Sequence, residues 1–281
     1  MKKLLVTGGS GYLGQYLLPA AAREFDLYAT SHMAPVAHGK SVFLDLTNRA
    51  EVERVLLEIQ PDAIIHAAAI NPGQGSAEWM QRINTDGTRW LAQAAAEIGA
   101  RLVYISTDVV HDGRHAPYTD DAPPNPLNAY GKSKAAAEAA VRRECPGAAI
   151  VRTSLIYGLD EMDRGTEGFV NRLKSGEELV LFSDVIRQPV WVDSLVAALL
   201  KLVNLDYAGL LNVAGRQALT REEFGRKMLA WWGINGDNRL KSGRAADISG
   251  TIPLDLRLVV NKAESLLEQP LPGVDEVLAQ Q

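Results

Sequence analysis

The sequence predicts an α/β protein with a Rossmann-type, doubly wound parallel sheet and a smaller C-terminal lobe. Three observations support this fold class: short apolar runs alternate with helical segments, the apolar runs are nearly continuous, and a glycine-rich loop follows the first of them. Continuous apolar runs are typical of strands buried on both faces, as in a parallel sheet covered by helices. Strand–helix alternation further implies right-handed crossovers between parallel strands.

The elements of the first half of the chain follow one another in a regular order. Strands are expected over residues 2–7, 25–30, 41–46, 63–69, 101–107 and 148–153. Helices are expected between them, over residues 11–24, 48–59, 76–98 and 128–143. The second helix shows the basis of these assignments, because its apolar residues recur at helical spacing until Pro61 ends the segment.

The alternation loosens after residue 157, which predicts a second, smaller lobe. Residues 158–168 are polar and contain glycine, so a loop is expected there. A helix over residues 192–203 and a strand over 209–215 then resume the earlier pattern. The predicted organisation is a Rossmann domain of residues 1–157, which residues 190–214 rejoin, and a smaller substrate lobe of residues 158–189 and 215–281.

Composition and charge exclude several classes of protein. The chain has 281 residues, of which 47% are hydrophobic and 22% charged, with a formal net charge of −5 and no long basic run. Nucleic acid or an anionic membrane is therefore not expected as the main partner. No window approaches the ~18–20 apolar residues of a membrane span, and the N-terminus lacks the apolar core of a signal peptide. A cytoplasmic protein is expected, and the single cysteine, Cys145, is interpreted as structural.

The stretch VTGGSGYLG follows the first strand and opens the first helix. Gly9, Gly11 and Gly14 match the pattern G-x-G-x-x-G. With Gly8 in place of Gly9, the glycines match T-G-x-x-G-x-x-G instead. In either register, glycines allow a tight turn and a close approach of the backbone to a pyrophosphate, while the helix N-terminus supplies N–H donors. The position of the motif between strand and helix therefore predicts a dinucleotide site.

The end of the second strand indicates which dinucleotide is preferred. An acidic residue there selects NAD, because it accepts a hydrogen bond from the 2′-hydroxyl of the adenosine ribose. This chain has Thr30, Ser31 and His32 instead, whose groups can donate to a 2′-phosphate, although the nearest lysine is Lys40. NADP is therefore expected in preference to NAD.

The stretch NAYGKSK carries a candidate proton-transfer pair. Tyr130 and Lys134 are four residues apart, so a helix places them on one face. A tyrosine with a pKa of ~10 is a poor acid–base group at neutral pH. A lysine cation at ~4 Å, with an effective dielectric constant of ~20, favours the phenolate by ~4 kcal/mol, or ~3 pK units. The pair therefore predicts a Tyr130 pKa near ~7, where general acid–base catalysis is efficient.

Two hydroxyl groups lie at the end of the strand predicted over residues 101–107. They belong to Ser106 and Thr107, and either could hydrogen-bond a substrate oxygen. In open α/β sheets, ligands bind outside the carboxyl ends of the strands, and the glycine loop lies at the same edge. We therefore expect the glycine loop, Thr107 and the start of the helix with Tyr130 to converge.

Together these motifs resemble the extended short-chain dehydrogenase/reductase superfamily. The similar stretches are TGGSGYLG, HAAA, INTDGT, YISTD and YGKSK. Within this superfamily the chain resembles the dTDP-4-dehydrorhamnose reductase family, which also includes the regulatory beta subunit of methionine adenosyltransferase. The second likeness covers nearly the whole chain, is strongest over residues 1–158, and is carried by QPDAIIHAAA, RLVYISTDVVHDG, PYTDDAPPNPLNAYGKSKAAAE, VRTSLIYG and PLDLRLVVNKAESLL.

The resemblance implies roles for the matching residues. Tyr130 would be the general acid, Lys134 would lower its pKa and hold the cofactor ribose, and Thr107 would bind the substrate carbonyl. With the interpretations above, the expected cofactor contacts are Gly8, Gly11, Tyr12, Leu13, Gly14, Thr30, Ser31, Asp45, Leu46, Ala67, Ala68, Ala69, Ser106, Tyr130, Lys134 and Arg152. The expected substrate contacts are Asn84, Thr107, Asp108 and Arg187. Arg187 would pair with the diphosphate of a nucleotide sugar, with a structural ion pair as the alternative.

The sequence departs from the family at positions that bear on the substrate. Val109 and His111 replace an aromatic pair, and Leu155 stands where rhamnose reductases usually carry tryptophan. Dehydratases of the superfamily usually carry glutamate at the position of Val109, which argues against a dehydratase. His111 and His115 bracket a polar loop, and no metal is expected there.

Three functions fit these residues. The first is an NAD(P)H-dependent reductase of a nucleotide-linked keto sugar, in which hydride passes to the carbonyl carbon and Tyr130 protonates the oxygen. The second is a non-catalytic, NADP-binding regulatory subunit that needs a partner protein. The third is a nucleotide-sugar epimerase. The expected ligands are NADP and a nucleotide sugar, and a homodimer is considered for the assembly.

Overall fold

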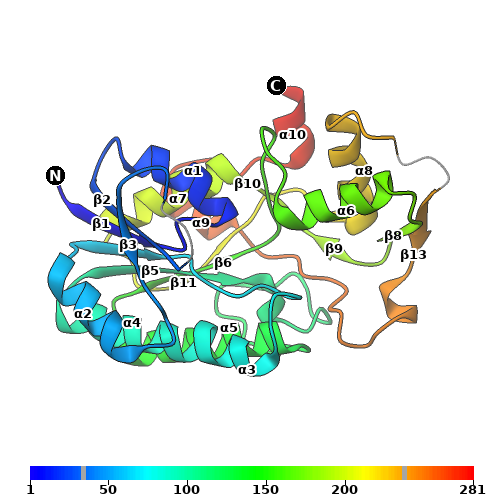
Figure 1. The fold of residues 1–281 in the computed structure, drawn as a ribbon. Helices are drawn as coiled ribbons and strands as arrows, with labels where there is room; N and C mark the ends of the chain where they lie inside the picture. The colour runs from blue at the N-terminus through cyan, green and yellow to red at the C-terminus, as the bar shows by residue number, and fades with distance from the viewer. Residues whose placement is uncertain (33–35, 236–238) are drawn as a thin grey trace.

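The computed structural model describes residues 1–32, 36–235 and 239–281. Among these residues, seven parallel strands form one sheet in the order β11–β6–β5–β4–β1–β2–β3 (Figure 1). The chain builds outward from β1 to β3, then returns past β1 and adds β4, β5, β6 and β11 on the other side. This order confirms the predicted Rossmann-type parallel sheet, and it places the reversal of strand order between β1 and β4.

The strands of the sheet are short. They are β1 (Lys3–Thr7), β2 (Asp26–Ser31), β3 (Lys40–Phe43), β4 (Ala63–His66), β5 (Arg101–Thr107), β6 (Ala149–Thr153) and β11 (Gly209–Val213). Every residue of β4 and β6 is buried, as expected for near-continuous apolar runs covered on both faces. β3 and β4 end earlier than the sequence predicts, because the chain leaves the ladder at Phe43 and at His66.

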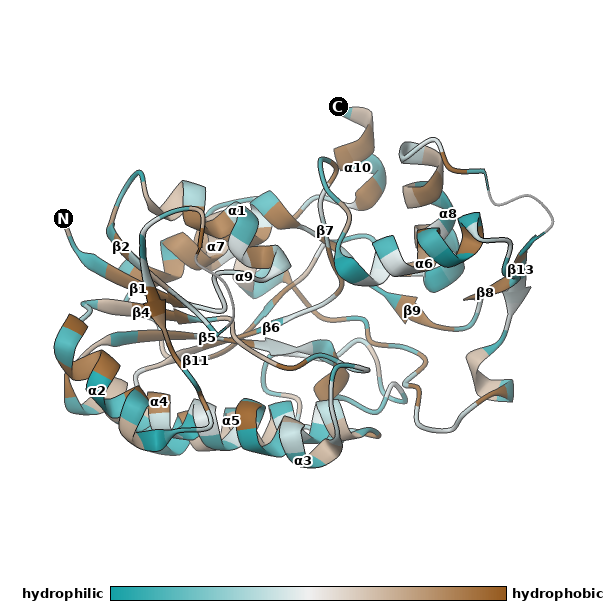
Figure 2. Ribbon diagram, viewed as in Figure 1, coloured by the Kyte–Doolittle hydropathy of each residue, from teal (hydrophilic) through white to brown (hydrophobic). Residues whose placement is uncertain are grey.

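Helices cover both faces of the sheet (Figure 1). One face carries α1 (Tyr12–Ala21), α7 (Val192–Asn204) and α9 (Asn261–Leu267), and the other carries α2 (Arg49–Ile59), α4 (Thr88–Glu97) and α5 (Ala129–Glu144). Successive residues of β1 are buried on opposite faces: Leu4 belongs to the first apolar cluster and Leu5 to the second. Figure 2 shows hydrophobic residues along the central strands β1 and β4, between the two helical layers.

A smaller lobe lies beside the sheet, at the side toward which its strands run (Figure 1). It contains α6 (Arg164–Lys174), α8 (Arg221–Trp231) and the parallel pair β8 (Leu179–Phe182) and β13 (Leu240–Gly243). Its own apolar cluster includes Leu173, Leu181 and Leu229. The short elements around it are β7 (Ile156–Tyr157), β9 (Ile186–Arg187), β10 (Val190–Trp191), β12 (Leu219–Thr220) and α10 (Val274–Ala279).

The loop predicted over residues 158–168 is wrong in its second part, because α6 begins at Arg164. Asp163 caps this helix, and its side chain accepts hydrogen bonds from the backbone N–H groups of Gly165 and Thr166. The polar residues and glycine of this stretch therefore lie partly in the first turn of a helix, where such residues are also common.

The helix predicted over residues 76–98 is divided into three parts. α3 (Ala77–Met80) passes into a π-helical segment, Gln81–Gly87, and α4 follows at Thr88. A π-helical segment shifts the side chains after it around the helix axis, which the apolar pattern alone does not reveal.

The C-terminal part of the chain does not lie wholly in the smaller lobe. Leu256, Leu258, Ala263, Leu267 and Leu271 belong to the apolar cluster of the main sheet. The segment around α9 therefore returns to the sheet, as does β11, which pairs with β6. No helix among the described residues is long and apolar enough to cross a membrane.

Candidate active site

The glycine loop between β1 and α1 packs tightly against neighbouring backbone. Gly8 has a φ of +72°, a left-handed conformation that favours glycine. A Cβ added at Gly8 would lie 2.8 Å from the backbone of Ala68. A Cβ added at Gly14 would lie 2.2 Å from the carbonyl oxygen of Gly9. The loop therefore has no room for a side chain at either position, so Gly8 and Gly14 are both required by this geometry.

The N-terminus of α1 is available to an anionic group. Its N-cap residue, Gly11, has no side chain to accept from the first N–H groups, and the first turn, which includes Tyr12 and Leu13, holds no acid. Unpaired N–H groups and the helix dipole both favour a phosphate there. The predicted alanines, Ala67, Ala68 and Ala69, follow β4 directly beside this loop. The cradle and the uncapped helix end together fit the pyrophosphate of a dinucleotide.

The predicted adenosine contacts lie at the carboxyl ends of β2 and β3. Thr30 and Ser31 end β2 and are buried, while Asp45 and Leu46 follow β3. Lys40 is not among them, because it lies at the start of β3, opposite Tyr28 in the ladder.

Two basic side chains act on Asp45 at this end of the site. Burial raises the pKa of Asp45, but hydrogen bonds from Thr47 and the charges of His32 and Arg82 hold it below its ordinary value. Arg82 thus supplies positive charge near the expected adenosine ribose, where Lys40 does not, since its ammonium lies 2.8 Å from Asp26.

The start of α5 is fixed by its cap and by a close backbone contact. The Asn128 side chain accepts from the backbone N–H of Gly131 at 2.9 Å. A Cβ added at Gly131 would lie 2.3 Å from the carbonyl oxygen of Val109, so α5 begins directly on the turn that follows β5. This contact brings the start of α5, with Tyr130, against the turn that follows Thr107, whose hydroxyl donates to Asp108 at 3.2 Å and accepts from the backbone N–H of Val109 at 3.2 Å.

The helical spacing predicts a Tyr130 pKa near neutrality, but this prediction is wrong. The pKa is raised to about 12. Burial is the main cause, and the negative charge of Asp108 adds to it. The neighbouring Thr107 hydroxyl and the charge of Arg187 lower the pKa only in part. Tyr130 therefore keeps its proton at neutral pH, which suits a proton donor and makes it a poor base.

Lys134 explains why the prediction for Tyr130 is wrong. Its Nζ donates to the carbonyl oxygen of Ile105 at 2.6 Å and lies 4.4 Å from the ring centroid of Tyr104. The ammonium thus points toward β5, although both residues share one face of α5. Burial lowers the pKa of Lys134 to about 7, against the opposing effect of Glu138.

The buried lysine gives the first testable prediction. Because its pKa is about 7 in the folded protein and ~10.4 in an unfolded chain, only the unfolded chain binds this proton between those values. The free energy of unfolding should therefore rise with pH in this window, by up to about 1.4 kcal/mol per pH unit. Lys134→Met is expected to lack this rise and to be more stable than the wild type at pH 7. Urea unfolding of both proteins from pH 7 to 10 measures the difference, and equal slopes would contradict the prediction.

Asn84 is an interior residue that holds two segments together. It is fully buried in the π-helical segment. Its Nδ2 donates to the carbonyl oxygen of Ile70 at 3.0 Å and to Ser133 Oγ at 3.1 Å, and its Oδ1 accepts from the Ile70 N–H at 2.8 Å. Asn84 therefore joins the loop after β4 to α5, and in this position it has no surface for the predicted substrate contact.

Ser106 and Arg152 are also interior residues. Arg152 is fully buried and pairs with Glu138, with Nη2–Oε2 and Nε–Oε1 distances of 2.7 and 3.0 Å. Ser106 Oγ donates to the same carboxylate at 2.5 Å. The remaining guanidinium nitrogen donates to the carbonyl oxygens of Asp120 and Ala122. This network joins α5 to β5 and β6, and it keeps both side chains buried.

Asp108 and Arg187 form the structural ion pair that the sequence left as the alternative. Arg187 Nη2 and Nε donate to the two carboxylate oxygens of Asp108 at 2.6 and 2.8 Å. Ser154 Oγ also donates to Asp108, at 2.7 Å. The pair joins β9 to the end of β5, so the smaller lobe is fastened to the sheet beside Tyr130.

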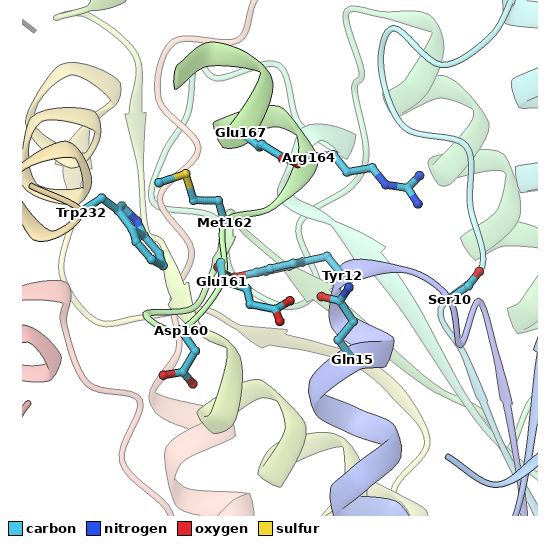
Figure 3. A pocket seen from close by; sticks show the side chains of 9 residues that line it. All are labelled: Ser10, Tyr12, Gln15, Asp160, Glu161, Met162, Arg164, Glu167 and Trp232. Carbon is cyan, nitrogen blue, oxygen red and sulfur yellow. Dashed lines mark hydrogen bonds between the residues drawn. The ribbon is translucent and has the colours of Figure 1, made fainter. Parts of the chain in front are cut away.

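A hollow of about 440 Å³ opens between the glycine loop and the smaller lobe (Figure 3). Its lining comes from both sides: Ser10, Tyr12 and Gln15 from the loop and α1, and Asp160, Glu161, Met162, Arg164, Glu167 and Trp232 from the lobe. Tyr12 bridges the two, because its hydroxyl donates to the carbonyl oxygen of Glu161 at 3.0 Å. The glycine loop therefore faces a space that the smaller lobe closes on one side.

Two supporting residues escaped the sequence interpretation. His66 lies fully buried at the end of β4, hydrogen-bonded to Thr7 and Thr88 at 2.6 and 2.8 Å, and burial with the charge of Lys134 lowers its pKa to about 3. Glu138 follows Lys134 at the same spacing at which Lys134 follows Tyr130. The repeated four-residue spacing could have indicated that Glu138 shares a helix face with Lys134. No local pattern could have indicated the role of His66, because its partners Thr7 and Thr88 lie far from it in the sequence.

The two histidines considered for a metal are placed differently. His111 is buried and stacks on Tyr118 with ring centroids 3.9 Å apart, while His115 is not packed in this pair. Across the part of the chain that the structure describes, no group of three or more His, Cys, Asp or Glu side chains is arranged to hold a metal ion.

The fold and the site together define a protein of the extended short-chain dehydrogenase/reductase type. The defining features are the parallel sheet order, the glycine loop at an uncapped helix, and the tyrosine and lysine of α5 at the carboxyl ends of the strands. The family model described as the RmlD substrate binding domain matches residues 1–272. The chain therefore belongs to this family, which confirms the resemblance found in its motifs.

Curated relatives fall into two groups. Methionine adenosyltransferase 2 subunit beta of Xenopus tropicalis is 34% identical over 164 residues, which are 56% of this chain and 48% of that protein. The match thus spans about half the length of that relative. A dTDP-4-dehydrorhamnose reductase of Mycobacterium tuberculosis is 31% identical over 231 residues, which are 78% of this chain and 72% of that protein.

A solved structure resembles the whole chain. It is a dTDP-4-dehydrorhamnose reductase of Bacillus anthracis in complex with NADP, with a TM-score of 0.85 and 28% sequence identity. The alignment covers 99% of this chain and 98% of that chain, so the sheet and the smaller lobe are both included.

Proposed function

We propose that the protein is an NAD(P)H-dependent reductase of a nucleotide-linked keto sugar. The observation that carries this proposal is the packing of the start of α5, which bears Tyr130, on the turn that follows Thr107 at the carboxyl end of β5, together with the glycine loop and the uncapped end of α1. The dinucleotide bound there would supply hydride to the carbonyl carbon of the substrate. The family, and the NADP complex of a similar reductase, support the same reaction class.

Thr107 and Tyr130 have distinct tasks in the proposed reaction. Thr107 holds the carbonyl oxygen of the substrate against Tyr130 by a hydrogen bond. Tyr130, with a pKa of about 12, carries its proton at neutral pH and gives it to that oxygen as the negative charge develops. Arg187 neutralises Asp108, so the tyrosinate left behind does not face an unpaired carboxylate.

NADP is proposed in preference to NAD. The end of β2 carries Thr30 and Ser31 and no acid that would select an unmodified ribose. Arg82 acts electrostatically on the neighbouring Asp45, so a positive charge is present near the position proposed for a 2′-phosphate. Gly8, Gly11 and Gly14 would hold the pyrophosphate, and Lys134 would contact the ribose next to the nicotinamide.

A non-catalytic regulatory role is the second candidate. It is favoured by the similarity to methionine adenosyltransferase 2 subunit beta, which is 34% identical over the matched residues. In that role the protein would bind NADP and a partner protein without turnover. A stoichiometric partner recovered by affinity capture, together with absence of carbonyl reduction, would favour this candidate over the first.

The reductase proposal is tested by following NADPH absorbance with purified protein and a panel of nucleotide-linked 4-keto-6-deoxy sugars. Decay of the absorbance that depends on both protein and sugar is the expected result. NADH in place of NADPH is expected to give a lower rate at equal concentration. Tight NADPH binding with no decay across the panel would contradict the reductase function and support the regulatory one.

A further inference from the structure

The smaller lobe places a second arginine beside Arg187. β9 and β12 pair antiparallel, with Leu219 opposite Arg187 and Thr220 opposite Ile186. Arg221 follows β12 directly, and its backbone N–H donates to the carbonyl oxygen of Val185 at 2.8 Å. The short ladder therefore carries Arg187 on one strand and Arg221 at the end of the other.

Arg221 is half-buried, and none of the residues that the structure describes serves it as a counter-ion. Its guanidinium makes no hydrogen bond or ion pair with any of residues 1–32, 36–235 and 239–281. Burial lowers its pKa to about 10, and the charge of Arg187 contributes, with Asp163 and Asp108 acting weakly in the opposite direction. A desolvated cation without a partner is costly, so the position is expected to serve a ligand.

The acids nearest to Arg221 in sequence are committed to other groups. Glu222 accepts from Arg226 and Ser242, and Glu223 accepts from the backbone and hydroxyl of Thr220 in a capping box. The N–H of Glu223 donates to Thr220 Oγ1 and that of Arg221 to the Val185 carbonyl oxygen, so the helix end is largely occupied and is not proposed as the anion site. The donors that remain available are those of the Arg221 side chain.

The short ladder connects Arg221 with the proposed reaction centre. Arg187 of β9 pairs with Asp108 at the end of β5, and Arg221 follows β12, the strand paired with β9. Both carboxylate oxygens of Asp108 hold Arg187, which leaves that guanidinium little capacity for a second anion. Arg221 has its planar fork of N–H donors free, and this fork suits the paired oxygens of a phosphate group.

We propose that Arg221 binds the diphosphate of the nucleotide-linked substrate, and that Arg187 serves mainly to hold Asp108. This assignment rests on the proposed function and names the residue that would recognise the charged part of the substrate. The pyrophosphate of the cofactor is the other diphosphate that the protein is proposed to bind. The cofactor pyrophosphate is proposed to bind at the glycine loop and the uncapped end of α1. A change at Arg221 should therefore affect binding of the nucleotide diphosphate but not of the dinucleotide.

The test is isothermal titration of the wild type and of Arg221→Met with dTDP and UDP, with thymidine and uridine, and with NADPH. Loss of a charged hydrogen-bonding group is expected to weaken dTDP or UDP binding about 10- to 100-fold. Affinity for the nucleosides and for NADPH should not change. Arg226→Met is the matched control on the same helix, since Arg226 is exposed and pairs with Glu222; it should bind like the wild type.

Folding of the variants gives an independent readout. Arg221→Met removes an uncompensated charge and should melt at or above the wild-type temperature. Arg221→Lys keeps the charge without the planar fork and should bind dTDP with intermediate affinity. If Arg221→Met does not fold, Arg221→Lys decides the question. An Arg221→Lys protein that folds and binds dTDP more weakly than the wild type would support the assignment. Failure of both variants to fold, or wild-type dTDP affinity in Arg221→Lys, would show a structural role and overturn the assignment.

The remaining outcomes also decide the question. Unchanged dTDP and UDP affinity in Arg221→Met, or loss confined to NADPH, would overturn the assignment, as would a wild-type protein that binds neither nucleotide. Arg221-dependent nucleotide binding without any carbonyl reduction would support this assignment while contradicting the reductase function.

Discussion

Tyr130→Phe is expected to lower the turnover number for carbonyl reduction by about 10²- to 10⁴-fold, because it removes the group that donates a proton to the substrate oxygen. NADPH affinity should stay nearly unchanged, since the glycine loop and Lys134 are untouched and only one hydroxyl is lost. Steady-state NADPH oxidation and NADPH titration measure the two quantities separately. Unchanged turnover in this variant would contradict the proposed mechanism.

The control is Tyr28→Phe, which removes the same atom from a tyrosine that lies before the carboxyl end of β2. Its hydroxyl accepts from the exposed Lys40, at 3.1 Å, away from the proposed reaction centre, so turnover should stay at the wild-type level. The pH profile adds a second check. Because the pKa of Tyr130 is raised to about 12, its proton is retained well above neutrality. The rate of reduction should therefore show no loss from Tyr130 ionisation between about pH 7 and 10.

Gly14→Ala is expected to destabilise the protein by about 2–4 kcal/mol and to abolish measurable NADPH binding. The added Cβ would lie 2.2 Å from the carbonyl oxygen of Gly9, a backbone atom that cannot move without opening the loop. Opening the loop also displaces Gly11 and the first turn of α1, where the pyrophosphate would be held. Urea unfolding and NADPH titration measure the two effects.

Gly147→Ala is the matched control for the glycine loop. A Cβ at Gly147 would have no heavy atom within 4 Å, so stability should change by no more than about 0.5 kcal/mol. Wild-type NADPH affinity in Gly14→Ala, with stability equal to that of Gly147→Ala, would show that the loop does not have the tight geometry described.

Local spacing was enough to predict the fold and part of the site. The apolar runs, the glycines after β1 and the helical spacing of Tyr130 and Lys134 are all readable within short windows of sequence. These features gave the parallel sheet, the cradle and the meeting of Thr107 with Tyr130. The start of α6 was missed because the cap formed by Asp163 lies in a stretch that also has the composition of a loop.

Contacts between distant segments could not be predicted in this way. The spacing of Tyr130 and Lys134 fixes a shared helix face, but not the direction of the ammonium, which the Ile105 carbonyl on another element decides. Arg152 and Arg187 also carried a plausible ligand role until their buried partners, Glu138 and Asp108, were placed. Local sequence does not distinguish Arg221, because its distinguishing property is that no such partner lies among the residues that the structure describes.

The course of the chain between the sheet and the smaller lobe has a mechanical consequence. The chain leaves the sheet after β6, returns for α7 and β11, leaves again for α8 and β13, and comes back through α9. Neither part is a continuous segment, so neither can be excised as an autonomous folding unit. Truncation after residue 157 would strip β11 from β6 and leave an unpaired sheet edge prone to aggregation. The two parts should accordingly melt in one cooperative transition.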